Sequence, residues 1–259
     1  MDLGINGRSA LVLGASQGLG QAIAKALAAE GVNVTLAARS TDKLTQTADE
    51  CRAMGVSADV MALDLNSAES VSALIAHLNN SPVDILLSNS GGPPPGTVPG
   101  VDPAAWGTHF NAMVLNQIQI IEAALPGMRK NGWGRVLAVS SSGIQIPIPH
   151  LAISNTLRSS LAAYCKTLAG QVACDGVTVN LLLPGRVDTP RVQSIDVNAA
   201  SKQGISADQA RANSIATIPA GRYGRPEEFG AVAAFYASDL AGYLTGNQIR
   251  IDGGLIRAL

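Results

Sequence analysis

Short apolar runs alternate with longer segments of helical periodicity along the chain. The segments between the first six runs are each long enough for a helical crossover, so the runs are expected to be parallel strands covered on both faces. This pattern predicts an α/β Rossmann fold, a doubly wound seven-stranded parallel sheet with helices on both faces. The predicted strands are Ala10 to Leu13, Asn33 to Ala38, Ala58 to Leu63, Val83 to Ser88, Arg135 to Ser140, Val177 to Leu183 and Gln248 to Ile251.

The chain is expected to form a single domain over residues 1–259, because no repeat, low-complexity linker or change of composition divides it. A stiff extended loop is predicted around the three successive prolines that begin at Pro93. A longer irregular stretch follows the sixth strand and contains a helical pattern from Ser206 to Ala216. Because long loops in compact domains are usually functional, we interpret residues 189–218 as a lid over a substrate.

Charge and composition exclude several classes of partner. The chain has 18 Lys and Arg against 19 Asp and Glu, and like charges do not cluster as binding to nucleic acid or to an anionic membrane requires. Neither an apolar stretch long enough to span a membrane nor a signal-peptide pattern is found, which favours a cytoplasmic protein that acts on a small molecule. Cys51, Cys165 and Cys174 lack metal-ligand spacing, so we expect buried free thiols and no metal site.

The first predicted strand runs into a glycine-rich turn and then into a helix, which is the arrangement that binds a dinucleotide. Glycines let the backbone approach a pyrophosphate closely, and the free amides of a helix N-terminus favour negative charge. A strand-to-helix turn without a ligand is the alternative interpretation. The residues expected to contact the coenzyme here are Gly14, Ser16, Gln17, Gly18, Leu19 and Gly20.

The ends of the second and third strands carry the residues expected at the adenosine end. Arg39 follows the second strand, where an acidic residue would bind a ribose 2′-hydroxyl and a basic one would bind a 2′-phosphate. We therefore expect NADP(H) rather than NAD(H). Asp64 and Leu65 follow the third strand, and Asp64 is placed either to accept from the adenine amino group or to cap the following turn.

Over essentially its whole length the chain resembles the short-chain dehydrogenase/reductase family. The similar segments include the Gly14 turn, Asn180, and the Asp252-Gly253-Gly254 run near the end. The resemblance implies a homotetramer, built partly on the helix predicted over residues 151–174 and on the helix before it. It also implies that one group of residues lines the adenosine side of the cleft and a second group holds the nicotinamide amide and the phosphates. The first group is Asn89, Ser90 and Gly91, and the second is Pro184, Gly185, Val187 and Thr189.

The catalytic positions depart from the family pattern. Family enzymes carry a serine after the fifth strand, a Tyr-x-x-x-Lys pair on the next helix and an asparagine on the preceding helix. By the family's spacing, Ser141 retains the serine, whereas Ser154, Arg158 and Met113 occupy the tyrosine, lysine and asparagine positions. Tyr164 and Lys166 lie farther along the same helix, turned away from Ser154, and we expect them to be a packing residue and a solvated or carbonyl-capping charge.

The resemblance and the chemistry of the side chains together suggest roles for these residues. Ser141 would hydrogen-bond the substrate oxygen, and Arg158 would fix the nicotinamide ribose, because a guanidinium does not deprotonate and cannot relay a proton. Ser154, a bound water, or His150 at the start of the helix would complete proton delivery. The corresponding function is NAD(P)(H)-dependent hydride transfer to or from a carbonyl or alcohol, including 3-oxoacyl compounds. The alternatives are an enone or enoyl reductase and a dinucleotide-binding sensor or scaffold without turnover.

Overall fold

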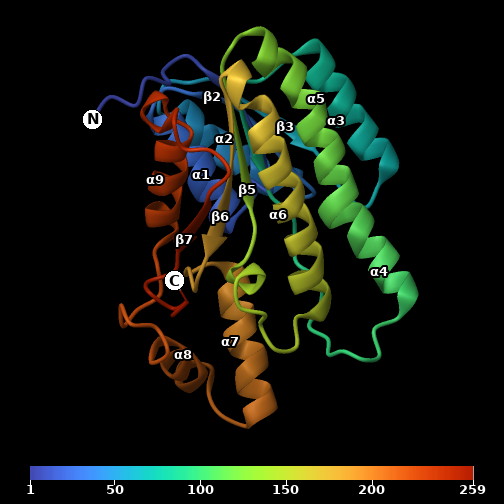
Figure 1. The fold of residues 1–259 in the computed structure, drawn as a ribbon. Coiled ribbons are helices and arrows are strands. Elements are labelled where there is room, and N and C mark those ends of the chain that lie inside the picture. Colours follow the sequence, from blue (N-terminus) through green and yellow to red (C-terminus); the bar gives the residue numbers. More distant parts are fainter. Residues whose placement is uncertain (259) are drawn as a thin grey trace.

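A seven-stranded parallel sheet forms the centre of the molecule (Figure 1). The structure is a computed structural model and describes residues 1–258. The strand order is β3-β2-β1-β4-β5-β6-β7, which confirms the doubly wound arrangement. Strand ends differ from the predicted ones by at most two residues. The strands are β1 (Ser9–Leu13), β2 (Asn33–Ala38), β3 (Ala58–Ala62), β4 (Ile85–Ser88), β5 (Gly134–Val139), β6 (Val177–Pro184) and β7 (Gln248–Ile251).

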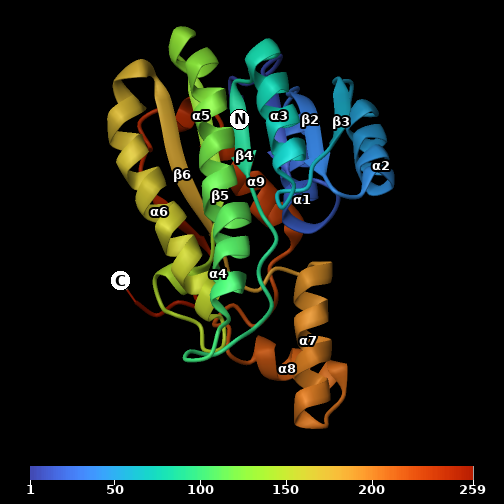
Figure 2. The same cartoon turned by 90° about the vertical axis from the view of Figure 1, so that its right-hand side faces the viewer.

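Helices cover both faces of the sheet, as the parallel strands require (Figure 2). Side chains of a strand alternate between faces, so Ala10 and Val12 of β1 contact one helix layer and Leu11 and Leu13 contact the other. The first layer consists of α1 (Gly18–Ala29), α2 (Thr41–Arg52) and α9 (Pro226–Tyr236). The second consists of α3 (Ala68–Asn80), α5 (Asn116–Lys130) and α6 (Ala152–Val172). A further helix, α4 (Pro103–Phe110), leads into α5 through a π-helical turn over Asn111–Leu115.

The predicted lid segment forms two helices that project beyond the carboxyl ends of the strands (Figures 1 and 2). They are α7 (Pro190–Gln203) and α8 (Ala207–Ile215), and only α8 was expected from the hydrophobic pattern. Thr189 caps α7 by accepting a hydrogen bond from the Val192 amide, and Pro190 occupies the first helical position. Gly204 ends α7 with a φ of 65°.

Five side chains test smaller expectations. Lys166 Nζ donates to the Gly246 carbonyl at 2.9 Å, as predicted for a carbonyl-capping charge. Tyr164 packs against the core as predicted, and burial together with Glu122 raises the pKa of its hydroxyl. Cys51 and Cys165 are buried, but the prediction was wrong for Cys174, which is exposed because it lies in the 3-10 turn after α6 rather than on the buried face of that helix. Among residues 1–258, no helix combines the length and apolarity that crossing a membrane requires.

Candidate functional site

The turn after β1 has a shape that only glycine allows. Gly14 and Gly18 have φ values of 68° and 63°, in the left-handed region that side chains disfavour. A Cβ at Gly14 would lie 2.6 Å from Asn89 Nδ2, and a Cβ at Gly20 would lie 2.2 Å from the Gly14 carbonyl oxygen. Gln17 precedes α1 and its side chain makes no capping hydrogen bond, so the first amides of α1 are left for another acceptor. This bare backbone surface at a helix N-terminus fits a coenzyme pyrophosphate.

Residues after β4 and β6 lie next to this turn, as the resemblance predicts. Asn89 contacts Gly14, and the Thr189 side chain lies 3.5 Å from the point that a Cβ at Gly18 would occupy. Gly185 leaves no room for a side chain either, because its Cβ would lie 2.5 Å from the Asp252 Cα. Val187 is buried and its segment pairs with Gly224. The structure therefore brings together three of the predicted coenzyme-binding segments, those that follow β1, β4 and β6.

Two cations lie after β2, on the side of the turn where the adenosine is expected. Arg39 is exposed directly after β2, and its charge is one of the factors that lower the pKa of Asp64. The largest factor is the hydrogen bond that Asp64 Oδ1 accepts from the Asn66 amide at 3.0 Å, so Asp64 also holds the turn before α3. Lys43 was not predicted to take part, yet its Nζ donates to Gln17 Oε1 at 2.9 Å. It lies four residues after Arg39, in the first turn of α2.

A buried amide on α5 holds the loop that follows β4. Gln117 is 1% exposed; its Oε1 accepts from Ser88 Oγ at 2.6 Å, and its Nε2 donates to Ser90 Oγ at 3.1 Å and to the Met113 carbonyl at 2.6 Å. Asn116 Nδ2 donates to the Leu65 carbonyl at 2.8 Å, which ties α5 to the end of β3. Sequence reasoning missed both side chains, because neither belongs to a motif and both act through partners far away in the chain.

The predicted catalytic residues lie around the end of β5. Ser141 Oγ accepts from the Gly143 amide at 3.0 Å, which leaves its own O–H proton available for a substrate oxygen. Ser154 is buried on α6, one turn before Arg158. Arg158 Nη1 donates to the Val139 carbonyl at 3.0 Å, so the guanidinium lies beside the last residue of β5. Burial and the charge of Arg191 lower the pKa of Arg158 to about 10, and the group stays positive at neutral pH.

The backbone of His150 adopts an unusual conformation, and its side chain is exposed. Its φ is 62°, and it is exposed just before α6. Its carbonyl accepts from the Gly96 amide at 2.8 Å, next to a bridge between Gly96 and Leu151. Asn155, also missed from the sequence, fixes the same loop, because its Nδ2 donates to the Ile148 carbonyl at 2.9 Å. Figure 1 shows this loop at the end of the sheet from which α7 projects.

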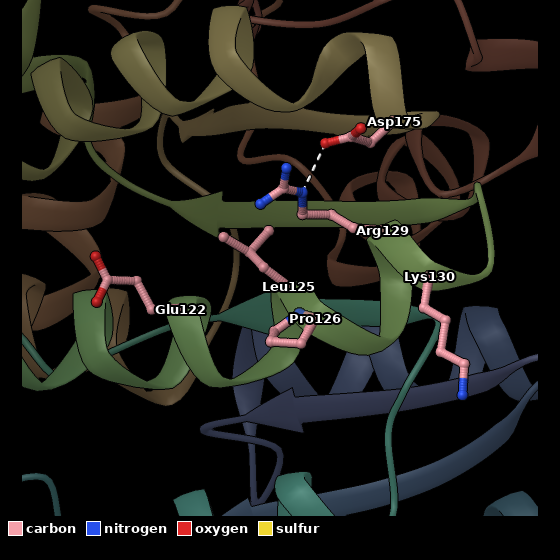
Figure 3. Close-up of a pocket in the computed structure, with 6 residues that line it drawn as sticks. All are labelled: Glu122, Leu125, Pro126, Arg129, Lys130 and Asp175. Carbon is pink, nitrogen blue, oxygen red and sulfur yellow. Dashed lines mark hydrogen bonds and ion pairs between the residues drawn. The ribbon is translucent and has the colours of Figure 1, made fainter.

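Two pockets of the surface lie at opposite edges of the sheet. A pocket of about 540 Å³ is lined by Glu122, Leu125, Pro126, Arg129, Lys130 and Asp175, and Arg129 Nε donates to Asp175 Oδ2 at 2.6 Å (Figure 3). It lies at the amino edge of the sheet, since α5 ends there and Asp175 precedes β6, whereas ligands of such sheets bind at the carboxyl edge. A second pocket of about 440 Å³ lies beside the ends of β6 and β7. Within residues 1–258, His, Cys, Asp and Glu side chains form no group of three that could hold a metal.

Comparison with known proteins agrees with this geometry. Residues 14–256 match the family model described as enoyl-(acyl carrier protein) reductase. The chain belongs to the short-chain dehydrogenase/reductase family. Members of this family are NAD(P)-dependent oxidoreductases, and the enzyme class of this chain follows from its membership.

Relatives of this short-chain dehydrogenase/reductase match it from end to end. The 3-oxoacyl-[acyl-carrier-protein] reductase FabG of Vibrio cholerae is 29% identical over 255 residues, 98% of this chain and 99% of that protein. The NADPH-dependent reductase BacG of Bacillus subtilis is 29% identical over 97% of this chain and 99% of that protein. L-sorbose reductase from Gluconobacter frateurii, solved with NADPH and L-sorbose, superposes with a TM-score of 0.94 at 29% identity and covers 100% of both chains.

Proposed function

We propose that this short-chain dehydrogenase/reductase is an NADP(H)-dependent enzyme that transfers hydride to or from a carbonyl or alcohol carbon, with 3-oxoacyl compounds as the substrate class. One observation carries the proposal: Asn89 and Thr189 close around the bare glycine turn after β1, and Ser141 and Arg158 lie at the same edge of the sheet, at the end of β5, with one strand between. The relationship to a 3-oxoacyl-[acyl-carrier-protein] reductase supports the substrate class.

The preference for NADP(H) rests on Arg39 and Lys43. Both cations lie at the start of α2, and Lys43 touches the glycine turn through Gln17. A 2′-phosphate would receive charge-assisted hydrogen bonds there, whereas NAD(H) has no group to meet them. The relatives described as NADPH-dependent, or solved with NADPH, support the same choice.

The coenzyme supplies the hydride when bound, and the chain supplies orientation and charge. Ser141 donates its O–H to the substrate oxygen, because the Gly143 amide already occupies one of its acceptor positions. Arg158, which donates to the Val139 carbonyl, would hold the nicotinamide ribose hydroxyls and would supply a fixed positive charge near the substrate oxygen on which negative charge develops. The guanidinium does not exchange its proton with the substrate.

Proton delivery has three possible sources in this proposal: Ser154, His150 and a bound water. The Ser154 hydroxyl is buried on the face of α6 that carries Arg158, whereas His150 is exposed at the entrance to that helix. The variants S154A and H150N separate the routes, because asparagine tolerates the left-handed backbone of position 150. If kcat falls at least about tenfold in one variant, the residue replaced there is the proton donor. If both variants keep the kcat of the wild type, the proton comes from water.

Conjugated-alkene reduction is the second candidate function. Serine stands where the family has its tyrosine acid, and Arg158 offers charge without a transferable proton. Hydride addition to carbon produces an enolate oxygen that a fixed cation stabilises, and solvent can protonate the carbon afterwards. NADPH consumption with an enone but not with the matching saturated ketone would favour this function over carbonyl reduction.

The test of the proposed function begins with coenzyme binding. NADPH titration is expected to give fluorescence transfer from the protein and a rise in Tm, with weaker effects from NADH. NADPH oxidation is then followed with 3-oxoacyl thioesters, saturated ketones and enones. S141A is expected to lower kcat about 100-fold while NADPH still binds. Binding without turnover of any compound would instead indicate the sensor or scaffold, and no binding would overturn the proposal.

Two larger features belong to the same proposal. Residues 189–218, which include α7 and α8, act as a lid that orders over the substrate when the coenzyme is bound. Four copies of the chain form a homotetramer through α5 and α6, the arrangement implied by the family resemblance.

A further inference from the structure

Two arginines from different helices converge on the loop after β4. Arg158 comes from α6, and Arg191 lies in the first turn of α7. A Cβ built at Gly92 would be 3.5 Å from Arg191 Nη2 and 3.9 Å from Arg158 Nη2, so both guanidinium groups lie within van der Waals reach of one point. Arg158 Nη2 also points toward the Ser90 carbonyl at 3.5 Å. The predicted lid helix α7 and the helix α6 of the predicted catalytic residues thus bring two positively charged side chains close together.

These two charges are not compensated within residues 1–258. Ion pairs there satisfy other arginines of the same region: Arg211 pairs with Asp188 at 2.7 Å, and Arg222 pairs with Glu228 at 2.7 Å. No carboxylate of the described chain lies within 4.0 Å of the Arg158 or Arg191 guanidinium. Two like charges brought this close repel each other; burial lowers the pKa of Arg158 most, and the charge of Arg191 lowers it further. An anion between them would remove this repulsion.

We propose that Arg158 and Arg191 bind a carboxylate of the substrate. This inference rests on the proposed hydride transfer and narrows its substrate class to short oxo acids in the free carboxylate form. Ribose hydroxyls are uncharged, so holding the ribose would require Arg158 alone and gives no reason for a second cation. Guanidinium groups offer paired N–H donors that match a carboxylate, and Arg158 has enough donors to contact both ribose and carboxylate.

The coenzyme diphosphate is the other anion that the pair could bind. Its expected place is the glycine turn after β1 and the N-terminus of α1. Arg158 instead lies between the ends of β4 and β5, against the Ser90 and Val139 carbonyls. Ser141 follows Val139 by two residues, so an anion held by Arg158 sits close to the oxygen that Ser141 would bind. This position favours a carboxylate only a few bonds from the reacting carbonyl, as in a 3-oxo acid.

The experiment compares acetoacetate and 3-oxohexanoate with their methyl esters, which keep the ketone and lack the charge. In the wild-type protein, kcat/KM is expected to be at least about 100-fold higher for each acid than for its ester. R191Q is expected to reduce this acid-to-ester ratio at least about tenfold, mainly through the KM of the acid, and R191K to restore part of it. K202Q removes an exposed charge from the last turn of the same helix and is the matched control.

A binding measurement keeps this proposal separate from the proposed function. Calorimetry on the protein saturated with NADP+ measures acetoacetate and methyl acetoacetate without turnover. Tighter binding of the acid that is lost in R191Q supports the carboxylate site even if no hydride is transferred. Equal binding of acid and ester overturns it. A tenfold weaker NADPH affinity in R191Q with an unchanged acid-to-ester ratio would also overturn it, by assigning the pair to the coenzyme diphosphate.

Discussion

Arg39 and Lys43 place two positive charges between the end of β2 and the first turn of α2, where the adenosine end of the coenzyme is expected. Arg39 is exposed and free to turn toward a ligand, while Lys43 is held near the glycine turn by Gln17. A hydrogen bond to a charged group contributes about 1.5–3 kcal/mol, so removing either cation should weaken phosphate binding at least about tenfold. The double variant R39Q/K43Q is expected to raise the Kd of NADPH about 100-fold and to leave the Kd of NADH nearly unchanged. Fluorescence titration with both coenzymes measures the change.

The control for this prediction is K25Q, which removes a cation from α1 that pairs with Glu50 instead of facing the turn. Equal losses of NADPH and NADH affinity in R39Q/K43Q would show that the two cations act on the shape of the turn and not on the 2′-phosphate.

Some site residues could be predicted from the sequence and others could not, for a physical reason. Gly14 and Gly18 are visible because their spacing follows from the backbone of a single turn. Gln117 and Arg191 are not, because their roles depend on partners supplied by distant segments: Ser88 lies 29 residues from Gln117, and Arg158 belongs to another helix. A buried glutamine in an apolar run resembles any other helix position until its partners are placed.

Among the elements, the strands were predicted well and α7 was not. A buried parallel strand is a short apolar run, and that run is visible without the rest of the fold. The α7 helix has few buried side chains, since Val192, Asp196 and Ala200 are the buried ones among its described residues. Its hydrophobic period is therefore weak, as is that of the predicted α8, which buries Ala210. The position of α7 beyond the sheet depends on contacts with α8 and on the hydrogen bond from Gln193 to Asp188 in the loop after β6.

The start of α9 provides a prediction on pH. Glu228 accepts from Arg222 Nη2 at 2.7 Å and from the Arg225 amide at 2.7 Å, and these bonds lower its pKa to about 2. Because the folded-state pKa is depressed, the carboxylate stabilises the fold fully above its ordinary pKa of about 4.5 and loses this effect as the pH falls toward about 2.

The matched variant is E228Q. Urea unfolding is expected to show a lower free energy of unfolding for E228Q than for the wild type at pH 7. The difference should shrink between pH 4.5 and pH 3, as far as the fold survives acid. A difference that stays constant across this range would contradict the assignment, because packing of the side chain and not its charge would then be responsible.

The predicted lid is tied to the segments beyond the carboxyl edge of the sheet by one ion pair and one aromatic ring. Arg211 of α8 bonds Asp188 at 2.7 Å and stacks over Tyr223, whose hydroxyl donates to the buried Asp196 of α7 at 2.9 Å. NADPH contacts at Thr189 should stabilise this arrangement and slow proteolysis between α7 and α8. R211Q is expected to be cleaved faster there without coenzyme and to be protected less by NADPH, as followed by mass spectrometry. Equal cleavage with and without NADPH would contradict a coenzyme-dependent lid.

At the scale of the whole molecule, the candidate site and the proposed subunit contact lie on different parts of the surface. The candidate site lies at the carboxyl edge, next to α7, whereas the outward faces of α5 and α6 point away from the sheet (Figure 2). The exposed side of α6 is smooth, because Ser159 and Ser160 turn their hydroxyls back onto the Asn155 and Thr156 carbonyls at 2.8 and 3.1 Å. Helices with such small side chains can approach a partner closely.

The proposed tetramer gives a prediction on this smooth face. Ala163 is exposed one turn beyond Ser159 and Ser160, so arginine there would place a long charged side chain in a close helix-to-helix contact. Size-exclusion chromatography with light scattering is expected to give four chain masses for the wild type and a smaller species for A163R. A29R, which adds the same charge at the exposed end of α1, should stay tetrameric. A wild-type mass of one chain would refute the tetramer, and a tetrameric A163R would move its interface away from this face of α6.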